Sequence, residues 1–212
     1  MPEAAASLSG DPTTPSYYGH AKTALLLLDF HSMFVKMAGG PKAPAALEIA
    51  ARMRTWAKSQ GIVVIHALIN VDAVTFPTCK GAERLSSIMG DMKSGGVEEP
   101  PQLLQDFSQD EPTFTRTPGH VSALKSPGLQ EFLHEKGIKS LILTGLSTSG
   151  CVLRTAITAT DAEFVVSVIS DACADRDQDV HEVVVEKLIP SRGYVTTASV
   201  FQEEYAKART RD

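Results

Sequence analysis

The stretch LILTGLSTSGCVL, residues 141–153, decides the fold. It opens with an apolar run that ends at Thr144, passes through glycines and small hydroxyl residues, and then reaches Cys151. A short apolar run predicts a buried strand, and the small residues after it predict a tight turn into a helix. The stretch therefore predicts a strand, a turn and a helix that carries a thiol in its first turn.

The same strand character recurs along the chain. Apolar runs bounded by turn residues predict strands at residues 24–29, 62–69, 113–116, 140–144, 164–169 and 194–197. Their apolar residues are continuous rather than alternating, which is typical of strands covered on both faces in a parallel sheet.

Segments with the apolar spacing of helices lie between these strands. The residues expected to share a helix face are Ile49, Met53 and Trp56; Leu129, Phe132 and Leu133, ahead of Gly137 as a C-cap; Val152, Ala156 and Ala159; and Val180, Val183, Val184 and Leu188. Strands that alternate with helices indicate βαβ units, so we predict a doubly wound α/β fold.

Length and composition narrow the class of protein. A chain of 212 residues is long enough for one buried core, so we expect a single domain over residues 21–212 after a flexible tail of residues 1–20. The net charge of −5 does not favour a nucleic-acid partner. The apolar runs are too short to span a membrane, and the N-terminus lacks the pattern of a signal peptide. Three cysteines without a CxxC pair fit a reducing compartment, and we expect a cytoplasmic protein with no membrane partner.

Residues 72–111 break the alternation of strands and helices. They are polar and contain two pairs, Gly95-Gly96 and Pro100-Pro101. Loops of this length are functional or disordered in most domains, so the segment is either a surface excursion or a lid over a pocket.

Cys151 is a candidate nucleophile because ligands of open parallel sheets bind beyond the carboxyl ends of the strands. A helix N-terminus there lowers the pKa of a thiol and offers N–H donors to an oxyanion. The alternative is a buried structural cysteine, the usual state of a free cysteine. Cys79 and Cys173 lack such a setting and are expected to be structural. Asp29, the acid that ends the apolar run ALLLLD, is either a strand-terminal residue or a partner of the thiol at the same edge.

These residues resemble the isochorismatase-like cysteine hydrolases. The family has the patterns D-x-Q-x-x-F, G-[VL]-x-T-x-x-C-V and V-x-x-D-A, which correspond here to residues 29–34 (DFHSMF), 145–152 (GLSTSGCV) and 168–172 (VISDA). The resemblance spans roughly residues 22–200, and the cysteine turn is its most specific part. It implies a Rossmann-like, three-layer αβα sandwich around a six-stranded parallel sheet.

The resemblance also implies an activity. Members use an Asp-Lys-Cys catalytic triad to hydrolyse small amides, urea-type C–N bonds or the vinyl ether of isochorismate, so we expect a hydrolase with a small-molecule substrate and no cofactor. A cis peptide is implied between Leu146 and Ser147, with the N–H groups of Ser147 and Cys151 as the oxyanion hole. A homo-oligomer, dimer or tetramer, is implied as well.

The chain departs from the family at two positions. His31 stands where Gln is usual, and the only cation in register with the family's Lys is Arg116, because Lys125 should belong to the next helix. Arg cannot exchange protons near neutral pH but can hold a thiolate and pair with Asp29. Proton transfer would then fall to Asp29 or to His120, which otherwise merely lines the pocket.

We therefore expect Cys151, Asp29 and Arg116 to be catalytic, and His31, Phe34 and His120 to line the substrate pocket. Nicotinamidases of this family bind a metal through an Asp-x-His element, and residues 66–72 (HALINVD) have no such spacing, so no metal is expected.

Three other interpretations remain open. Ser147 begins like the nucleophile elbow of serine hydrolases, although Ser149 replaces the Gly that this motif requires. The missing Lys is compatible with a non-catalytic binding or regulatory homologue that keeps only the pocket. An NAD-binding protein is disfavoured because no G-x-G-x-x-G follows a strand.

Overall fold

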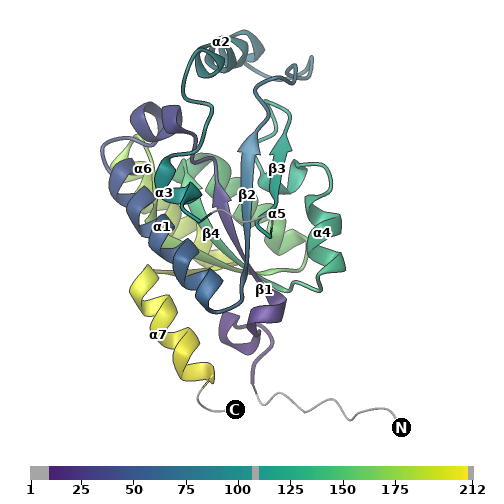
Figure 1. Cartoon of the computed structure of the whole chain (residues 1–212), viewed down its shortest axis with the longest axis vertical. Helices are drawn as coiled ribbons and strands as arrows, with labels where there is room; N and C mark the ends of the chain where they lie inside the picture. Colours follow the sequence, from purple (N-terminus) through teal and green to yellow (C-terminus); the bar gives the residue numbers. More distant parts are fainter. Residues whose placement is uncertain (1–9, 107–109, 210–212) are drawn as a thin grey trace.

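A computed structural model describes residues 10–106 and 110–209 and contains one six-stranded sheet (Figure 1). Its strands run in the order β3-β2-β1-β4-β5-β6, and every neighbouring pair is parallel. The strands are β1 (Thr23–Leu28), β2 (Val63–Ile69), β3 (Thr113–Arg116), β4 (Ser140–Leu146), β5 (Val165–Ala174) and β6 (Tyr194–Thr196). The six predicted strands and the parallel sheet are confirmed.

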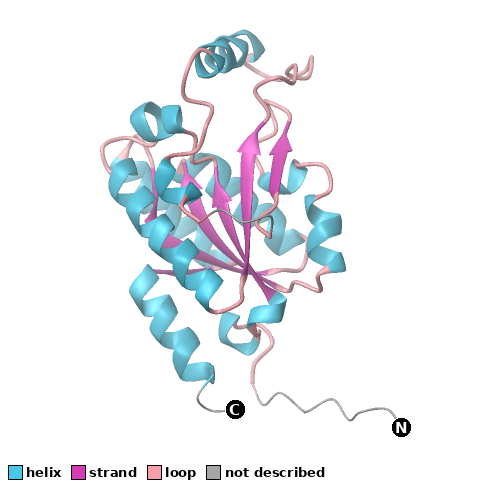
Figure 2. Ribbon diagram, in the orientation of Figure 1, coloured by secondary structure: helices cyan, strands magenta, loops and turns pink. Residues whose placement is uncertain are grey.

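Helices cover both faces of the sheet (Figure 2). Leu25 and Leu27 of β1 pack toward α1 (Ala43–Ser59) and α7 (Ala198–Arg209). Leu26 and Leu28 pack toward α4 (Leu129–Glu135) and α5 (Leu153–Asp161). All four leucines are fully buried, and each such burial stabilises the fold by about 2 kcal/mol. The three-layer αβα sandwich is confirmed.

Strand β5 is longer than predicted. It continues beyond Ile169 to Ala174, and its register against β4 shifts between the pairs Leu143–Val168 and Gly145–Cys173. The polar pair Ser170-Asp171 resembles a strand end, but Asp171 accepts a hydrogen bond from Ala198 N (2.9 Å) and thereby caps α7.

The apolar face predicted for residues 180–188 is not buried as a unit. The segment is α-helical over α6 (Gln178–Val183) and continues as the π-helical turn η6 (Val184–Leu188). Val184 is buried, whereas Val180, Val183 and Leu188 are exposed. The wider π turn changes the spacing that brings residues to one face, which the α-helical pattern cannot anticipate.

Residues 72–111 contain two helices, α2 (Ala82–Lys93) and α3 (Pro101–Leu104). Figure 1 shows α2 standing beyond the carboxyl ends of the strands. Met89 and Met92 of α2 bury themselves with Val71 in a small separate cluster. The sequence did not predict α2 because only two of its residues, both methionines, are buried, so it has no periodic apolar face.

Buried polar contacts fix the last part of this segment, before β3, to α1 and β2. Arg54 of α1 donates two hydrogen bonds to Glu111 (2.6 and 2.7 Å), and Lys58 donates a third (2.6 Å). His66 of β2 pairs with Glu99 through Nδ1 at 2.8 Å. Burial alone would raise the pKa of the Glu111 carboxyl, but the hydrogen bonds from Arg54 and Lys58 outweigh it and hold this pKa below its usual value.

Part of the predicted N-terminal tail, residues 1–9, lies outside the described residues. The rest of it contains the short 3₁₀ turns η1 (Pro15–Tyr17) and η2 (His20–Lys22), which leads into β1. Tyr194 of β6 donates a hydrogen bond from its hydroxyl to the carbonyl of Thr13 (3.1 Å). Within the described parts of the chain, every helix is too short or too polar to cross a membrane.

Gly145 of β4 lies directly beside Leu28, the last residue of β1, and its lack of a side chain lets the two backbones approach closely. Its φ is +154°, and a Cβ atom there would lie 2.5 Å from both the carbonyl oxygen and the Cβ of Leu28. Gly137, with φ +67°, has nothing within 4 Å of the same position.

Gly145→Ala should lower the free energy of unfolding by about 3 kcal/mol, because the added methyl group meets backbone atoms that cannot move aside. Gly137→Ala is the matched control and should lower it by only about 1 kcal/mol, the cost of the left-handed conformation alone. Urea unfolding of both variants measures the difference. Equal losses would show that the close approach to Leu28 is not the constraint.

Candidate active site

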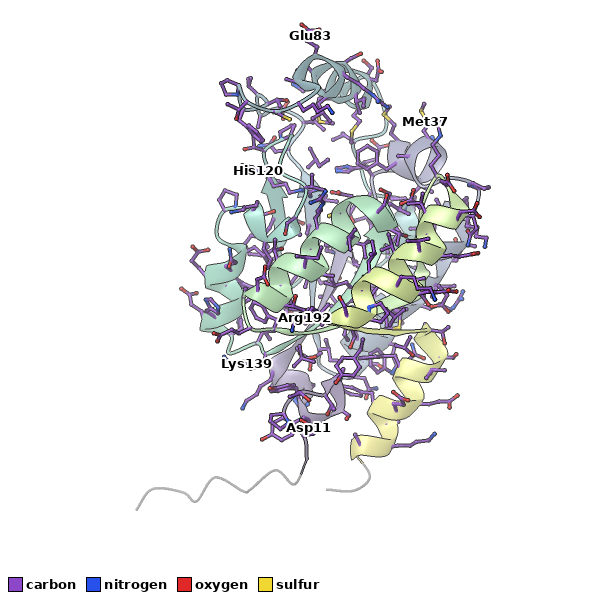
Figure 3. All side chains as sticks on the ribbon, turned by 180° about the vertical axis from the view of Figure 1, so that it is seen from behind. Asp11, Met37, Glu83, His120, Lys139 and Arg192 are labelled. Carbon is purple, nitrogen blue, oxygen red and sulfur yellow. The ribbon has the colours of Figure 1, made fainter. Side chains whose placement is uncertain are left out.

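The predicted catalytic residues come from the carboxyl ends of three strands. Asp29 follows β1, Arg116 ends β3, and Cys151 lies in the turn after β4. Figure 3 shows His120 at the same end of the molecule as Glu83 of α2, with Lys139, which precedes β4, far below it. Because β2 separates β1 from β3, Arg116 reaches across the end of β2 to Asp29.

Arg116 and Asp29 form a buried, bidentate ion pair. Nη1 donates to Oδ1 at 2.9 Å and Nη2 to Oδ2 at 2.5 Å, while Nε donates to the carbonyl of His120 at 3.0 Å. Burial would lower the pKa of the guanidinium, but the Asp29 carboxylate outweighs it and raises that pKa above its ordinary value. Arg116 therefore remains charged and fixes the orientation of Asp29.

The Cys151 thiol lies against this pair with only 3 % of the residue exposed. The Asp29 carboxylate acts on this thiol, and the sulfur lies 3.7 Å from Oγ1 of Thr155. Burial is the largest influence on the thiol and raises its pKa, and the Asp29 charge raises it further. Arg116 and Thr155 lower the pKa by less, so the net shift is well above the usual range.

The expectation that a helix tip and a guanidinium keep this sulfur ionised is therefore wrong for the resting protein. The Arg116 charge is already matched by Asp29, so little of it is left to offset the desolvation of a thiolate. The group at residue 151 is a protonated thiol beside a carboxylate.

The turn that carries Cys151 is held by residues that sequence analysis missed. The peptide between Leu146 and Ser147 is cis, as the resemblance implied, and η5 (Thr148–Val152) follows it as a π-helical turn. Ser149 donates from N and Oγ to Asp175 (2.8 and 2.7 Å). The hydroxyl of Thr148 lies 2.8 Å from Nδ1 of His181. Asp175 directly follows β5, which is the same signal that singled out Asp29, whereas His181 has no distinguishing pattern.

His31 joins the end of β2 to the segment that carries α2. Its Nδ1 lies 2.6 Å from the carbonyl of Val97, and its Nε2 accepts a hydrogen bond from Ile69 N (3.2 Å). An acceptor at Nε2 and a carbonyl beside Nδ1 assign the neutral tautomer with hydrogen on Nδ1. The side-chain amide of Gln also offers one donor and one acceptor, so His31 can replace the family's Gln in this bridge.

The other two residues expected in the substrate pocket lie at the same edge. The carbonyl of His120 contacts Arg116, while its ring packs at 5.0 Å from that of Phe76. Phe34 packs edge-on against His31 at 5.3 Å and borders the methionine cluster under α2. A substrate-lining role for these residues stays a prediction, as does the oxyanion hole formed by Ser147 and Cys151.

Lys125 is exposed in η4 (Ala123–Lys125), so Arg116 is the cation that faces Asp29. Over residues 10–106 and 110–209, no three His, Cys, Asp or Glu side chains group in a way that could hold a metal ion.

Comparisons with known proteins point to one family. The model of the isochorismatase domain matches residues 23–200. Maleamate amidohydrolase of Pseudomonas putida is 27% identical over 179 residues, which cover 83% of each chain. An isochorismatase family protein from Burkholderia thailandensis superposes with a TM-score of 0.72 at 19% identity, over 88% of this chain and 96% of the other. A cysteine hydrolase from Pseudomonas syringae superposes with a TM-score of 0.74 at 17% identity, over 90% and 95%.

The raised pKa of Cys151 predicts a loss of stability at alkaline pH. A thiol in the unfolded chain ionises near pH 8.5, whereas the folded protein keeps this proton. The stabilisation of the folded state that comes from this pKa difference is complete below about pH 8.5. It is lost above that pH, by at most about 1.4 kcal/mol per pH unit.

Urea unfolding at about pH 8 and about pH 10 should show a smaller loss for Cys151→Ala than for the unmodified protein. Burial raises the pKa of Cys173 to about 12, so Cys173→Ala should reduce the loss in the same direction. An identical pH dependence of the unfolding free energy in all three proteins would contradict the raised pKa of these thiols.

The bridge made by His31 predicts different effects for two substitutions. His31→Gln keeps a donor for Val97 and an acceptor for Ile69, so hydrogen exchange of the Ile69 amide should stay close to that of the unmodified protein. His31→Leu leaves both groups without a partner and should speed this exchange about tenfold. Exchange measured by NMR would contradict the bridge if the Leu variant behaved like the Gln variant.

Proposed function

The chain belongs to the isochorismatase family, and from that premise we propose that it hydrolyses a small amide with Cys151 as the nucleophile. The observation that carries the proposal is a buried Cys151 thiol on which both Asp29 and Arg116 act, with the orientation of Asp29 fixed by Arg116. A nucleophile, a base that contacts it and a third group that orients the base are the parts that covalent catalysis requires.

The first half of the reaction forms a thioester. Asp29 takes the proton of the Cys151 thiol as the sulfur attacks the carbonyl carbon of the amide. The N–H groups of Ser147 and Cys151 are the proposed donors to the oxyanion of the tetrahedral intermediate. As the C–N bond breaks, Asp29 returns the proton to the departing nitrogen, which leaves as ammonia or an amine.

The second half regenerates the enzyme. Asp29 takes a proton from water while the water oxygen attacks the thioester carbonyl. The C–S bond then breaks and the proton returns to the sulfur, so the net reaction is amide plus water to carboxylic acid plus amine. Arg116 cannot exchange protons at neutral pH, so the proposal gives the proton transfers to Asp29, with His120 at the same edge as the alternative.

Two findings support an amide of small size as the substrate. Maleamate amidohydrolase, the relative at 27% identity, acts on an amide by its name. Asp29, Arg116 and Cys151 are each at most 3 % exposed, so a substrate must enter a confined space.

A second candidate function is binding without catalysis. The buried, protonated state of Cys151 and the replacement of the family's Lys by Arg116 favour it. Such a protein would bind the same class of small molecule and leave it intact.

Cys151→Ala should abolish ammonia release from a panel that begins with maleamate and extends to other small amides, ureas and, by product formation, isochorismate. We expect a loss of at least about 1000-fold, because the variant lacks the sulfur on which the proposed thioester forms. Cys173→Ala is the matched control, since Cys173 is buried to a similar extent but lies after the bulge of β5, and it should stay about as active as the unmodified protein.

Unchanged turnover in the Cys151→Ala variant would refute the nucleophile. Absence of turnover in the unmodified protein, together with a rise in its melting temperature on addition of a panel compound, would favour the binding function.

A further inference from the structure

We propose that Thr155 is a further catalytic residue, whose hydroxyl donates a hydrogen bond to the Cys151 sulfur and stabilises the thiolate that forms when the proton moves to Asp29. The inference rests on the proposed function for its role in turnover. The hydrogen bond itself can be tested without a substrate.

Thr155 lies one helical turn after Cys151, on the same face of the helix. Its residue is fully buried, and its Oγ1 is 3.7 Å from the sulfur. Water therefore does not compete for this hydroxyl, and the contact lies inside the protein at the reacting atom.

The direction of the hydrogen bond follows from the other partners of the two groups. Oγ1 of Thr155 accepts a hydrogen bond from Ala123 N at 2.9 Å, which leaves its own hydrogen to donate. Within the described parts of the chain, the Cys151 sulfur is the only acceptor in contact with this hydroxyl. The Asp29 carboxylate, which acts on the thiol, is a stronger acceptor for the single thiol hydrogen than a hydroxyl is, so the proposal has the sulfur accept from Thr155.

The need for such a donor arises from how Arg116 is used. Its guanidinium is engaged by both oxygens of Asp29 and by the carbonyl of His120. A hydrogen bond to an ionised acceptor is about twice as strong as one to a neutral acceptor, so Thr155 stabilises the thiolate more than the resting thiol. This differential stabilisation is what accelerates a reaction.

Thr158 provides a matched control one turn further along α5. Its hydroxyl lies 2.5 Å from that of Ser122 and donates to the carbonyl of Arg154, but it has no contact with the sulfur. Thr155 and Thr158 thus both tie α5 to residues 122–123, and only Thr155 also contacts Cys151.

The experiment compares Thr155→Val, Thr155→Ser and Thr158→Val in the full chain. The readout is the rate at which iodoacetamide modifies Cys151 between about pH 7 and pH 10, measured on the peptide by mass spectrometry. Thr155→Val should be modified about tenfold more slowly, since a hydrogen bond to a charged group is lost. Thr155→Ser, which keeps the hydroxyl, and Thr158→Val should stay within about threefold of the unmodified protein.

Unchanged modification of Thr155→Val would overturn the proposal, and so would an equal slowing in Thr158→Val, which would reveal a purely structural tie. If iodoacetamide does not reach the sulfur, the ultraviolet absorbance of the thiolate replaces it, taken as a difference from Cys151→Ser. At a fixed pH of about 10 it should be about tenfold smaller in Thr155→Val, because the thiolate fraction below the midpoint is proportional to the acid constant. A Thr155 effect without turnover of any panel compound would retain the hydrogen bond and refute the amidase function.

Discussion

The ion pair between Asp29 and Arg116 is the constraint on which the rest of the site depends. Both side chains are almost completely buried, and removing one partner from such a pair costs about 3–5 kcal/mol. The end of β1 and the end of β3 must therefore be held at a fixed separation across β2. The same guanidinium binds the carbonyl of His120, so the loop after β3 is positioned by the pair as well.

Burial and, after it, the ion pair determine the state of the thiol. A free cation beside Cys151 would favour the thiolate, but this cation is matched by a carboxylate that itself disfavours a second negative charge. The resting group is consequently a thiol, and chemistry must begin with transfer of its proton to Asp29. An uncharged group in contact with the sulfur, such as the Thr155 hydroxyl, then matters more, because it stabilises the thiolate that the transfer produces more than it stabilises the resting thiol.

The described parts of residues 72–111 form a polar segment beyond the carboxyl ends of the strands. Both ends of this segment are held to the sheet by polar contacts. His31 bridges Ile69 and Val97, while the contact between His66 and Glu99 and the buried ion pair between Arg54 and Glu111 hold its return to β3. Its buried apolar side chains include Met89 and Met92 of α2 and Leu103 of α3. The segment is therefore anchored by apolar contacts as well as by these polar ones.

The amino-acid sequence by itself determined the six parallel strands, most of the helices and the turn that carries Cys151. Strands buried on both faces need continuous apolar runs, so their positions are local properties of the chain. Asp29 was singled out by its place at a strand end, and Arg116 by its register with the Lys of the family that the chain resembles. Only the tertiary structure decided that these two charges pair across β2, that burial keeps the proton on Cys151, and that Asp175 and His181 hold its turn. Pairing and desolvation depend on which groups the sheet order brings together, and residues far apart in the chain carry no local signal of it.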